Sequence, residues 1–204
     1  MSHTNSIAAP PGLPPNFVAF ATGGTGEWTS IAETRQYTNA FIIQEGKILL
    51  GYKKRGFGLG KYNGFGGKVD PGETPAEAAV RELQEEAGIS APLEHTGTLV
   101  FLLDTVPWTF HIDVYSAREF TGEPIETDEM RPEWFALPSD IAGAAFVSDL
   151  PQIPYETMWA DDVYWMRHLL QGIPFVGRCD FEKDGLEGEG SKIVRWWFGA
   201  PRHT

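Results

Sequence analysis

Cysteine, basic side chains and long apolar runs are all scarce in this 204-residue sequence, and each shortage argues against a class of protein. A single cysteine, Cys179, forms no intrachain disulfide and no multi-cysteine zinc site, so a reducing compartment is expected. The 16 Lys and Arg residues against 28 Asp and Glu give a net charge of −12, which argues against a nucleic-acid-coating surface. The longest apolar stretches, such as residues 99–103, are too short to span a membrane.

The first residues carry no recognisable targeting signal. They hold no basic segment followed by an apolar block, and no Lys or Arg precedes Arg35. This pattern predicts neither secretion nor mitochondrial import, so we expect the protein in the cytoplasm or the nucleus. We also expect a monomer that acts on a small molecule rather than on polymeric nucleic acid or a membrane.

Composition divides the chain into an N-terminal extension, residues 1–34, and a domain, residues 35–204. The extension contains Pro10, Pro11, Pro14 and Pro15 and several glycines, which is typical of a flexible segment. Apolar periodicity predicts strands at 37–43, 47–53, 98–105, 109–116, 134–137, 175–182 and 192–198, and helices at 75–87 and 161–171. Residues 139–152, with weak periodicity, are expected to form a loop insertion. The sequence therefore predicts one α/β domain with a mixed sheet.

Charge is distributed unevenly around the glycine-rich segment 56–67. Basic residues flank or interrupt this segment at Lys53, Lys54, Arg55, Lys61 and Lys68. Acidic residues then crowd into 17 positions, at Asp70, Glu73, Glu77, Glu82, Glu85 and Glu86. Basic side chains and loop N–H groups bind phosphate oxygens, and carboxylates bind divalent cations. The pattern favours a phosphate chain that binds together with a metal ion.

The helix predicted over residues 75–87 has clear start and stop signals. Thr74 and Glu77 have the spacing of a capping box, and Gly88 follows the last helical position. Glu82, Glu85 and Glu86 fall on one face, within about 100° of arc. Such a face is either solvated or neutralised by a cation, and the neighbouring basic glycine-rich segment favours the cation.

Residues 67–89 match a known signature. They run Gly67, five residues, Glu73, seven residues, then Arg81-Glu82-Leu83-Gln84-Glu85-Glu86-Ala87-Gly88-Ile89, which is the pattern of the Nudix box. Residues 53–58, 63–69, 127–132 and 158–165 also resemble the MutT-type oxidised purine nucleoside triphosphatases of animals. The resemblance runs from about Tyr37 to Phe181. It implies the α/β/α Nudix sandwich and hydrolysis of 8-oxo-dGTP or 2-hydroxy-dATP to monophosphate and pyrophosphate, which would sanitise the nucleotide pool.

The resemblance also implies which residues act on the phosphates. Mg²⁺, or Mn²⁺ in its place, would bind Glu82, Glu85, Glu86, Glu129 and the Gly66 carbonyl. Glu86 and Glu129 would be catalytic, and the sequence leaves open which glutamate removes the proton from water. Lys53, Gly67 and Lys68 would contact substrate, while Glu73 and Arg81 would brace the junction between loop and helix through an ion pair.

The same resemblance implies a pocket for the purine. Its residues would be Thr38, Phe57, Asn63, Phe101, Trp159, Asp161, Asp162 and Phe181, and Phe65 would be a further substrate contact. Aromatic rings would stack on the base, while Asn63 and the two aspartates would select it. Neighbouring carboxyls in an apolar pocket do not easily both ionise, so one would keep its proton. The alternative is that Asp161 and Asp162 merely open a helix, where acidic side chains favour the dipole.

Two other functions remain open at this stage. A Nudix hydrolase of another nucleoside diphosphate derivative, such as ADP-ribose, a dinucleotide or an RNA cap, would carry the same box; Asn63, Trp159 and the aspartates argue against it. A pseudoenzyme that binds nucleotides would tolerate loss of box carboxylates, and none is lost. Leu103 stands where the resembled enzymes usually have a pocket Phe, and loss of that ring would loosen stacking on the base.

Overall fold

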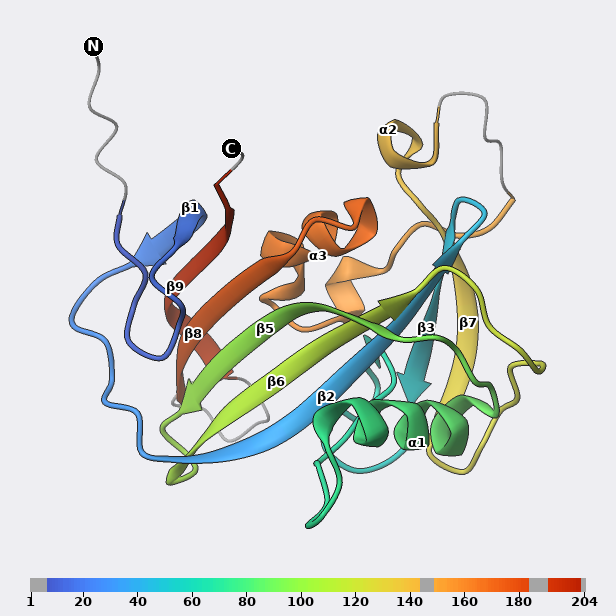
Figure 1. Cartoon of the computed structure of the whole chain (residues 1–204), viewed down its shortest axis with the longest axis horizontal. Coiled ribbons are helices and arrows are strands. Elements are labelled where there is room, and N and C mark those ends of the chain that lie inside the picture. Colours follow the sequence, from blue (N-terminus) through green and yellow to red (C-terminus); the bar gives the residue numbers. More distant parts are fainter. Residues whose placement is uncertain (1–6, 144–148, 184–190, 203–204) are drawn as a thin grey trace.

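The computed structural model describes residues 7–143, 149–183 and 191–202. Within these ranges, nine strands form one mixed sheet in the order β1-β9-β8-β5-β6-β2-β3-β4, with β7 also paired to β3 (Figure 1). The strands are β1 (Phe17–Gly24), β2 (Glu33–Gln44), β3 (Lys47–Lys53), β4 (Tyr62–Asn63), β5 (Glu94–Leu103), β6 (Trp108–Ala117), β7 (Met130–Ala136), β8 (Phe175–Lys183) and β9 (Ser191–Pro201). The helices are α1 (Pro75–Ala87), α2 (Ser139–Ala142) and α3 (Asp162–Gln171), with a 3-10 turn, η1 (Tyr155–Thr157). Pairing is parallel between β2 and β6 and between β5 and β8, which makes the sheet mixed.

The two long helices cover opposite faces of the sheet. Phe41 and Ile43 of β2 belong to the core that contains Trp165 of α3. Ile42, between them, packs in a second core with Leu83 of α1. Successive side chains of a strand point to opposite faces, so α1 and α3 lie on different sides. The three-layer α/β/α arrangement expected from the sequence is confirmed.

Helix α1 begins and ends where the sequence predicts. Thr74 Oγ1 accepts a hydrogen bond from the Glu77 amide at 3.3 Å, and Glu77 Oε2 accepts one from the Thr74 amide at 2.7 Å. Gly88 ends the helix with a φ of 72°, a conformation that glycine adopts without steric penalty. These caps fix the position of the acidic face relative to the glycine-rich segment.

The expectation of a flexible extension over residues 1–34 is wrong for much of the described part. Residues 17–24 form β1, which pairs antiparallel with β9. The buried Arg178 guanidinium donates to the Pro11 carbonyl at 2.8 Å and to the Thr29 carbonyl at 2.5 Å, while the Thr29 amide donates to Asp180 at 2.8 Å. Unpaired strand backbone and a buried charge both require partners, and the N-terminal segment supplies them.

Other predicted boundaries shift or fall outside the described ranges. Strand β7 begins at Met130 rather than at 134, and the two-residue strand β4 was not predicted. The expected loop insertion, 139–152, contains α2 and a bridge from Gln152 to Ala136, while residues 144–148 lie outside the described residues. The predicted turn around Gly185, Gly188 and Gly190 also lies outside them. Among the described residues, no helix is both long and apolar enough to cross a membrane.

Candidate active site

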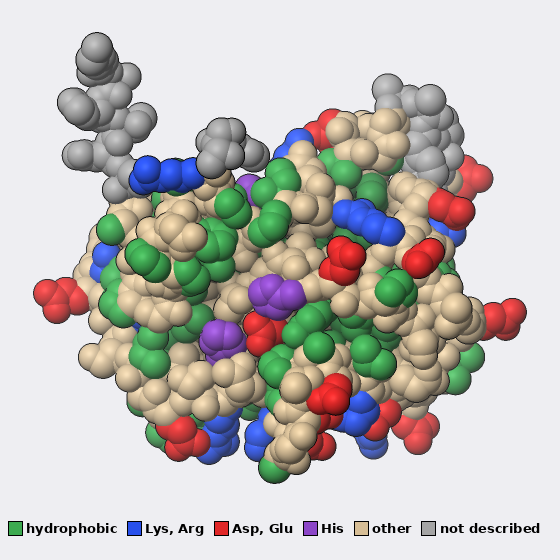
Figure 2. All heavy atoms as spheres, in the orientation of Figure 1, with side chains coloured by type: hydrophobic (Ala, Val, Ile, Leu, Met, Phe, Trp, Pro, Cys, Tyr) green, Lys and Arg blue, Asp and Glu red, His purple; other side chains and the backbone are tan. Residues whose placement is uncertain are grey.

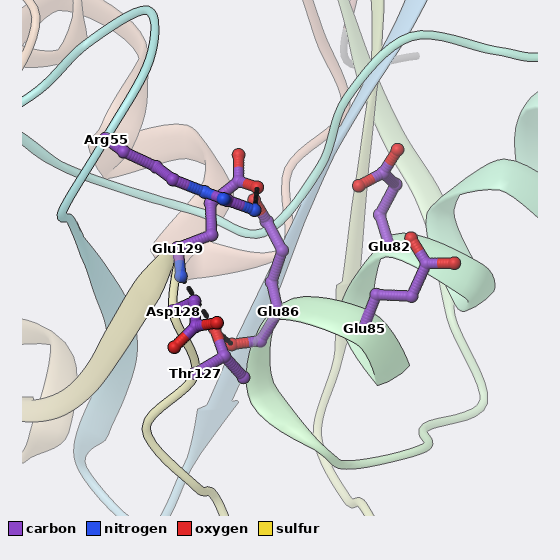
Figure 3. Close-up of a pocket in the computed structure, with 7 residues that line it drawn as sticks. All are labelled: Arg55, Glu82, Glu85, Glu86, Thr127, Asp128 and Glu129. Carbon is purple, nitrogen blue, oxygen red and sulfur yellow. Dashed lines mark hydrogen bonds and ion pairs between the residues drawn. The ribbon is translucent and has the colours of Figure 1, made fainter.

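The acidic face of α1 and the loop before β7 enclose a hollow of about 330 Å³ (Figure 3). The residues that line it are Arg55, Glu82, Glu85, Glu86, Thr127, Asp128 and Glu129. Glu82 and Glu85 project side by side from α1, while Glu86 reaches toward Glu129 and Arg55. Acidic and basic side chains intermingle around the lower edge of Figure 2, where Figure 1 places α1. The hollow therefore gathers the predicted box carboxylates and Glu129 from separate elements.

Lys53 joins the two carboxylates predicted to be catalytic. Its Nζ donates to Glu86 Oε1 at 3.0 Å and also to Glu129 Oε1. Glu86 is only 4% exposed, and its second oxygen accepts from the Gly66 amide at 2.9 Å. Arg55 adds a bond to the other Glu129 oxygen at 3.3 Å. Glu86 is thus held between the end of β3, the glycine-rich segment and α1.

Burial and mutual contacts shift the pKa values of Glu86, Lys53 and Glu129. Burial raises the pKa of Glu86 to about 6, although the charge of Lys53 acts in the opposite direction. Burial also lowers the pKa of Lys53, but hydrogen bonds and charge from Glu129 and Glu86 outweigh that effect and raise it. The hydrogen bond from Lys53 lowers the pKa of Glu129. At neutral pH the cluster holds an ammonium group between two carboxylates.

Replacing Glu86 with glutamine should stabilise the metal-free protein, and the gain should depend on pH. A shift from the ordinary value of 4.5 to about 6 means that ionised Glu86 costs the folded state about 2 kcal/mol. The cost is absent below pH 4.5, grows as the pH rises to 6, and is complete above it. We expect Glu86→Gln to raise the unfolding free energy in urea with EDTA at pH 7 and to leave it unchanged at pH 4. An equal gain at both pH values would contradict this account.

Arg81 braces the junction between the loop and α1, as the sequence predicts. Its guanidinium donates to both oxygens of Glu73, at 2.7 and 3.1 Å. It also bonds Glu82 at 2.9 Å and Glu85 at 3.2 Å, so it neutralises two of the box carboxylates.

Gly66 is required because its backbone packs closely against β2. A Cβ on Gly66 would lie 2.1 Å from the Thr38 carbonyl oxygen.

The donor chemistry of the hollow fits a hard divalent cation. Carboxylate and carbonyl oxygens are the ligands that such cations take, and Glu82, Glu85, Glu86 and Glu129 all line it. Within residues 7–143, 149–183 and 191–202, no three acidic, histidine or cysteine groups stand close enough to share an ion as they lie. Lys53 and Arg81 neutralise these carboxylates instead. A bound cation would take over that neutralisation and release Lys53 and Arg81 from these carboxylates.

Four of the aromatic residues predicted to bind the purine form two ring pairs. The Trp159 ring stacks on Phe57 with centroids 5.1 Å apart, and the Phe101 and Phe181 rings meet edge to face at 5.5 Å. Lys61 links the glycine-rich segment to the Trp159 loop, with Nζ 3.1 Å from the Met158 carbonyl oxygen and 5.1 Å from the Trp159 ring centroid. Lys61 was not among the predicted site residues, because an isolated lysine carries no sequence signal of its partner.

Asp161 and Asp162 are both buried at the start of α3. Asp161 Oδ2 accepts from the Trp165 indole at 2.9 Å, and Asp162 Oδ2 accepts from the Trp159 amide at 3.1 Å. Burial raises the pKa of both carboxyls, and the charge of Asp161 raises that of Asp162 further. Asp161 makes no side-chain cap bond to the helix within the described residues. Acidic residues that only favour the helix dipole can stay exposed at the helix start. The burial of two adjacent acids, which costs free energy, therefore argues for a further role.

The structure corrects one predicted substrate contact and places the others. The Phe65 side chain is fully buried in the core beside Leu83 of α1, so its ring does not face a ligand. The backbone of Phe65 pairs with Ala40 of β2, and this pairing turns the ring toward α1. Thr38 is buried, and its amide donates to the Gly67 carbonyl at 2.9 Å. Lys68 is exposed, and its carbonyl accepts from Arg81 at 3.3 Å.

Comparison with known proteins places this chain among related sequences and folds. Residues 33–169 match the NUDIX domain. The chain is 42% identical over 146 residues to the oxidized purine nucleoside triphosphate hydrolase of Danio rerio, covering 71% of this chain and 85% of that protein. It is 40% identical over 153 residues to the mouse (Mus musculus) protein of the same name, covering 74% and 90%. A mutator MutT protein from Bacillus halodurans shares the fold, with a TM-score of 0.62 at 22% identity over 80% of this chain and 97% of that one.

NUDIX proteins typically depend on a divalent metal ion, which agrees with the oxygen-rich donor set around Glu86. The match spans most of the domain predicted from the sequence, and it includes both the acidic face of α1 and the buried aspartates. The chain therefore belongs to the NUDIX domain family.

Proposed function

We propose that this protein hydrolyses oxidised purine nucleoside triphosphates to the monophosphate and pyrophosphate, with Mg²⁺ as its metal and Mn²⁺ able to substitute. Relatives of this name align over 85% and 90% of their own length. The observation that carries the proposal is the buried pair Asp161 and Asp162 beside Trp159. Pyrophosphate chemistry alone gives this pair no role, whereas recognition of a modified base gives it one.

At the phosphate end, Glu82, Glu85, Glu86, Glu129 and the Gly66 carbonyl would hold the metal ion. When bound, Mg²⁺ supplies positive charge that neutralises the phosphate oxygens and the developing transition state. One of the two carboxylates Glu86 and Glu129 would orient the attacking water and accept its proton. Lys53 pairs with both Glu86 and Glu129, and once released from these carboxylates it would be free to pair with phosphate oxygens.

At the base end, Trp159 and Phe57 offer aromatic surface, and Asn63 with the aspartates offers hydrogen bonds. Stacking on the aromatic rings adds affinity but does not discriminate between bases. Hydrogen bonds to a buried acid pair discriminate, because a protonated carboxyl donates to a carbonyl while an ionised one accepts from N–H. The raised pKa values of both acids support a shared proton near neutral pH.

Replacing Asp162 with asparagine tests this assignment of the base pocket. The wild type should hydrolyse 8-oxo-dGTP and 2-hydroxy-dATP in preference to dGTP, ADP-ribose, dinucleotides and capped RNA, as measured by pyrophosphate or nucleotide release. The amide does not ionise, so it fixes one donor–acceptor pattern. We expect kcat/KM to fall about ten- to a hundredfold, corresponding to a lost charge-assisted hydrogen bond of roughly 1.5–3 kcal/mol, and to fall unequally for the two oxidised nucleotides.

The matched control is Asp140→Asn, which removes a carboxylate that is exposed and paired with Arg167 of α3. It should leave all rates unchanged. Equal, small losses for both nucleotides in Asp162→Asn would show that the acid pair does not read the base. Preference of the wild type for ADP-ribose, a dinucleotide or a cap would replace the proposed substrate class, and absence of any hydrolysis would indicate a nucleotide-binding pseudoenzyme.

A further inference from the structure

Asn39 of β2 places a buried amide beside Asn63. Its side chain is 8% exposed, and its Nδ2 donates to Asn63 Oδ1 at 2.9 Å. Its own Oδ1 has no hydrogen-bond partner within the described part of the chain. The residues that follow it in β2, from Ala40 to Ile43, are apolar and fully buried. A buried amide whose oxygen has no partner lowers the stability of the folded protein, so the remaining hydrogen bond to Asn63 points to a functional role for Asn39.

The amide of Asn63 is held in one orientation. Its Oδ1 accepts two hydrogen bonds, one from Asn39 Nδ2 and one from the Gly64 amide, both at 2.9 Å. The Gly64 amide is a backbone donor, so the atom that faces it is an acceptor, and this identifies Oδ1. A carboxamide oxygen has two lone pairs, and both are used here. Asn63 therefore has only its NH₂ group left to offer a ligand.

The fit around Asn39 leaves this arrangement little room to change. A Cβ on Gly64 would lie 2.2 Å from Asn39 Oδ1, which shows how closely the Gly64 backbone packs on the Asn39 amide. With that oxygen turned toward Gly64, the Asn39 NH₂ group faces Asn63. Rotation of the Asn63 amide by half a turn would place its NH₂ group against two other donors.

We propose that Asn39 is a specificity-determining positioning residue: it holds Asn63 with its NH₂ group turned to the substrate, so that the pocket prefers a purine with a carbonyl at C6 to one with an amino group. The inference rests on the proposed function, in which Asn63 faces the base. Asn63 lies two residues from Lys61, which contacts both the Met158 carbonyl and the Trp159 ring. Guanine-type bases carry a carbonyl at C6 where adenine-type bases carry an amino group, and a donor-only amide distinguishes the two.

The experiment compares 8-oxo-dITP and 8-oxo-dATP, which share the oxidised C8 and differ at C6 and in the protonation of N1. In the wild type, kcat/KM should be higher for 8-oxo-dITP. In Asn39→Leu, the amide of Asn63 loses one of its two restraints, and the ratio of the two kcat/KM values should fall about three- to tenfold. In an Asn63→Leu background, adding Asn39→Leu should leave the ratio unchanged, because Asn39 acts through Asn63.

Ser116→Ala is the control for a general structural effect. It removes one partner of the buried Thr96–Ser116 hydrogen bond, 2.7 Å long, in β6. It should lower the melting temperature to a similar extent and leave the substrate ratio at the wild-type value. If Asn39→Leu folds poorly, Asn39→Asp keeps the side-chain shape, removes the donor, and should lower the ratio as well.

The outcomes separate this inference from the proposed function. If the wild type hydrolyses neither of these nucleotides nor 8-oxo-dGTP, the proposed function fails, and if it hydrolyses 8-oxo-dGTP but neither of these, the preference set by C6 is overturned. If it hydrolyses both, and the Asn39 variants lower both rates equally or change neither, the positioning role of Asn39 is overturned while the proposed function stands. An additive effect of Asn39→Leu in the Asn63→Leu background would likewise overturn action through Asn63.

Discussion

Glu86→Gln should lower kcat by about 10³-fold, equivalent to about 4 kcal/mol of lost transition-state stabilisation, while the protein stays folded. Glu86 is buried, bonded to Lys53 and to the Gly66 amide, and directed into the hollow with Glu129. Glutamine keeps the shape but loses the charge that binds a cation and balances Lys53. Steady-state hydrolysis of 8-oxo-dGTP across a Mg²⁺ titration, with circular dichroism to check folding, measures the effect.

Glu126→Gln serves as the matched control for that experiment. Glu126 is exposed, pairs with Lys54 at 2.6 Å near the same loop, and does not line the hollow. It should retain wild-type kcat. Activity of Glu86→Gln near the wild-type level at limiting Mg²⁺ would show that Glu86 does not hold the metal ion.

Arg178→Met should destabilise the protein by about 3–5 kcal/mol, because it leaves the Asp180 carboxylate buried without its cation. The Arg178 side chain is fully buried, and the Asp180 side chain is 5% exposed. The substitution also removes the bonds to the Pro11 and Thr29 carbonyls, so the N-terminal segment loses an anchor. We expect the melting temperature to fall by roughly 6–20 °C, and limited proteolysis to cut within residues 7–31.

A second Arg–Asp pair in the same chain provides the control. Arg167 and Asp140 lie 2.7 Å apart, but their side chains are 54% and 56% exposed. Arg167→Met should therefore change stability by less than about 1 kcal/mol. If both variants melted at the same temperature as the wild type, the N-terminal segment would not depend on Arg178.

Elements with local signals could be predicted from the sequence, and elements made by distant partners could not. Helix α1 has its cap, its first-position proline and its terminal glycine within one short stretch, and β3 has uninterrupted apolar character. Strand β1, by contrast, exists because its backbone pairs with β9, far along the chain. Its own apolar run, Phe17 to Ala21, is short and lies among prolines and glycines, so the surrounding composition favoured a flexible segment.

The candidate site divides in the same way. The common face of the three box glutamates could be predicted from their spacing on one helix. The ion pair between Arg81 and Glu73 could be predicted from the match to the Nudix box. Phe65 was predicted to contact substrate because it lies in a matching stretch, and pairing with β2 turns its ring into the core instead. Asn39 was missed because its partner, Asn63, is 24 positions away, and a single sequence does not show that contact.

The pairing of β1 with β9 also affects how the molecule behaves toward other copies of itself. Without β1, the long strand β9 would present a row of unpaired N–H and C=O groups at the edge of the sheet. Such an edge is a template for strands from other chains, and long exposed edges promote aggregation. Strand β1 is itself the outermost strand, but its 8 residues are fewer than the 11 of β9, so it shortens the open edge of the sheet, and its loss should favour self-association.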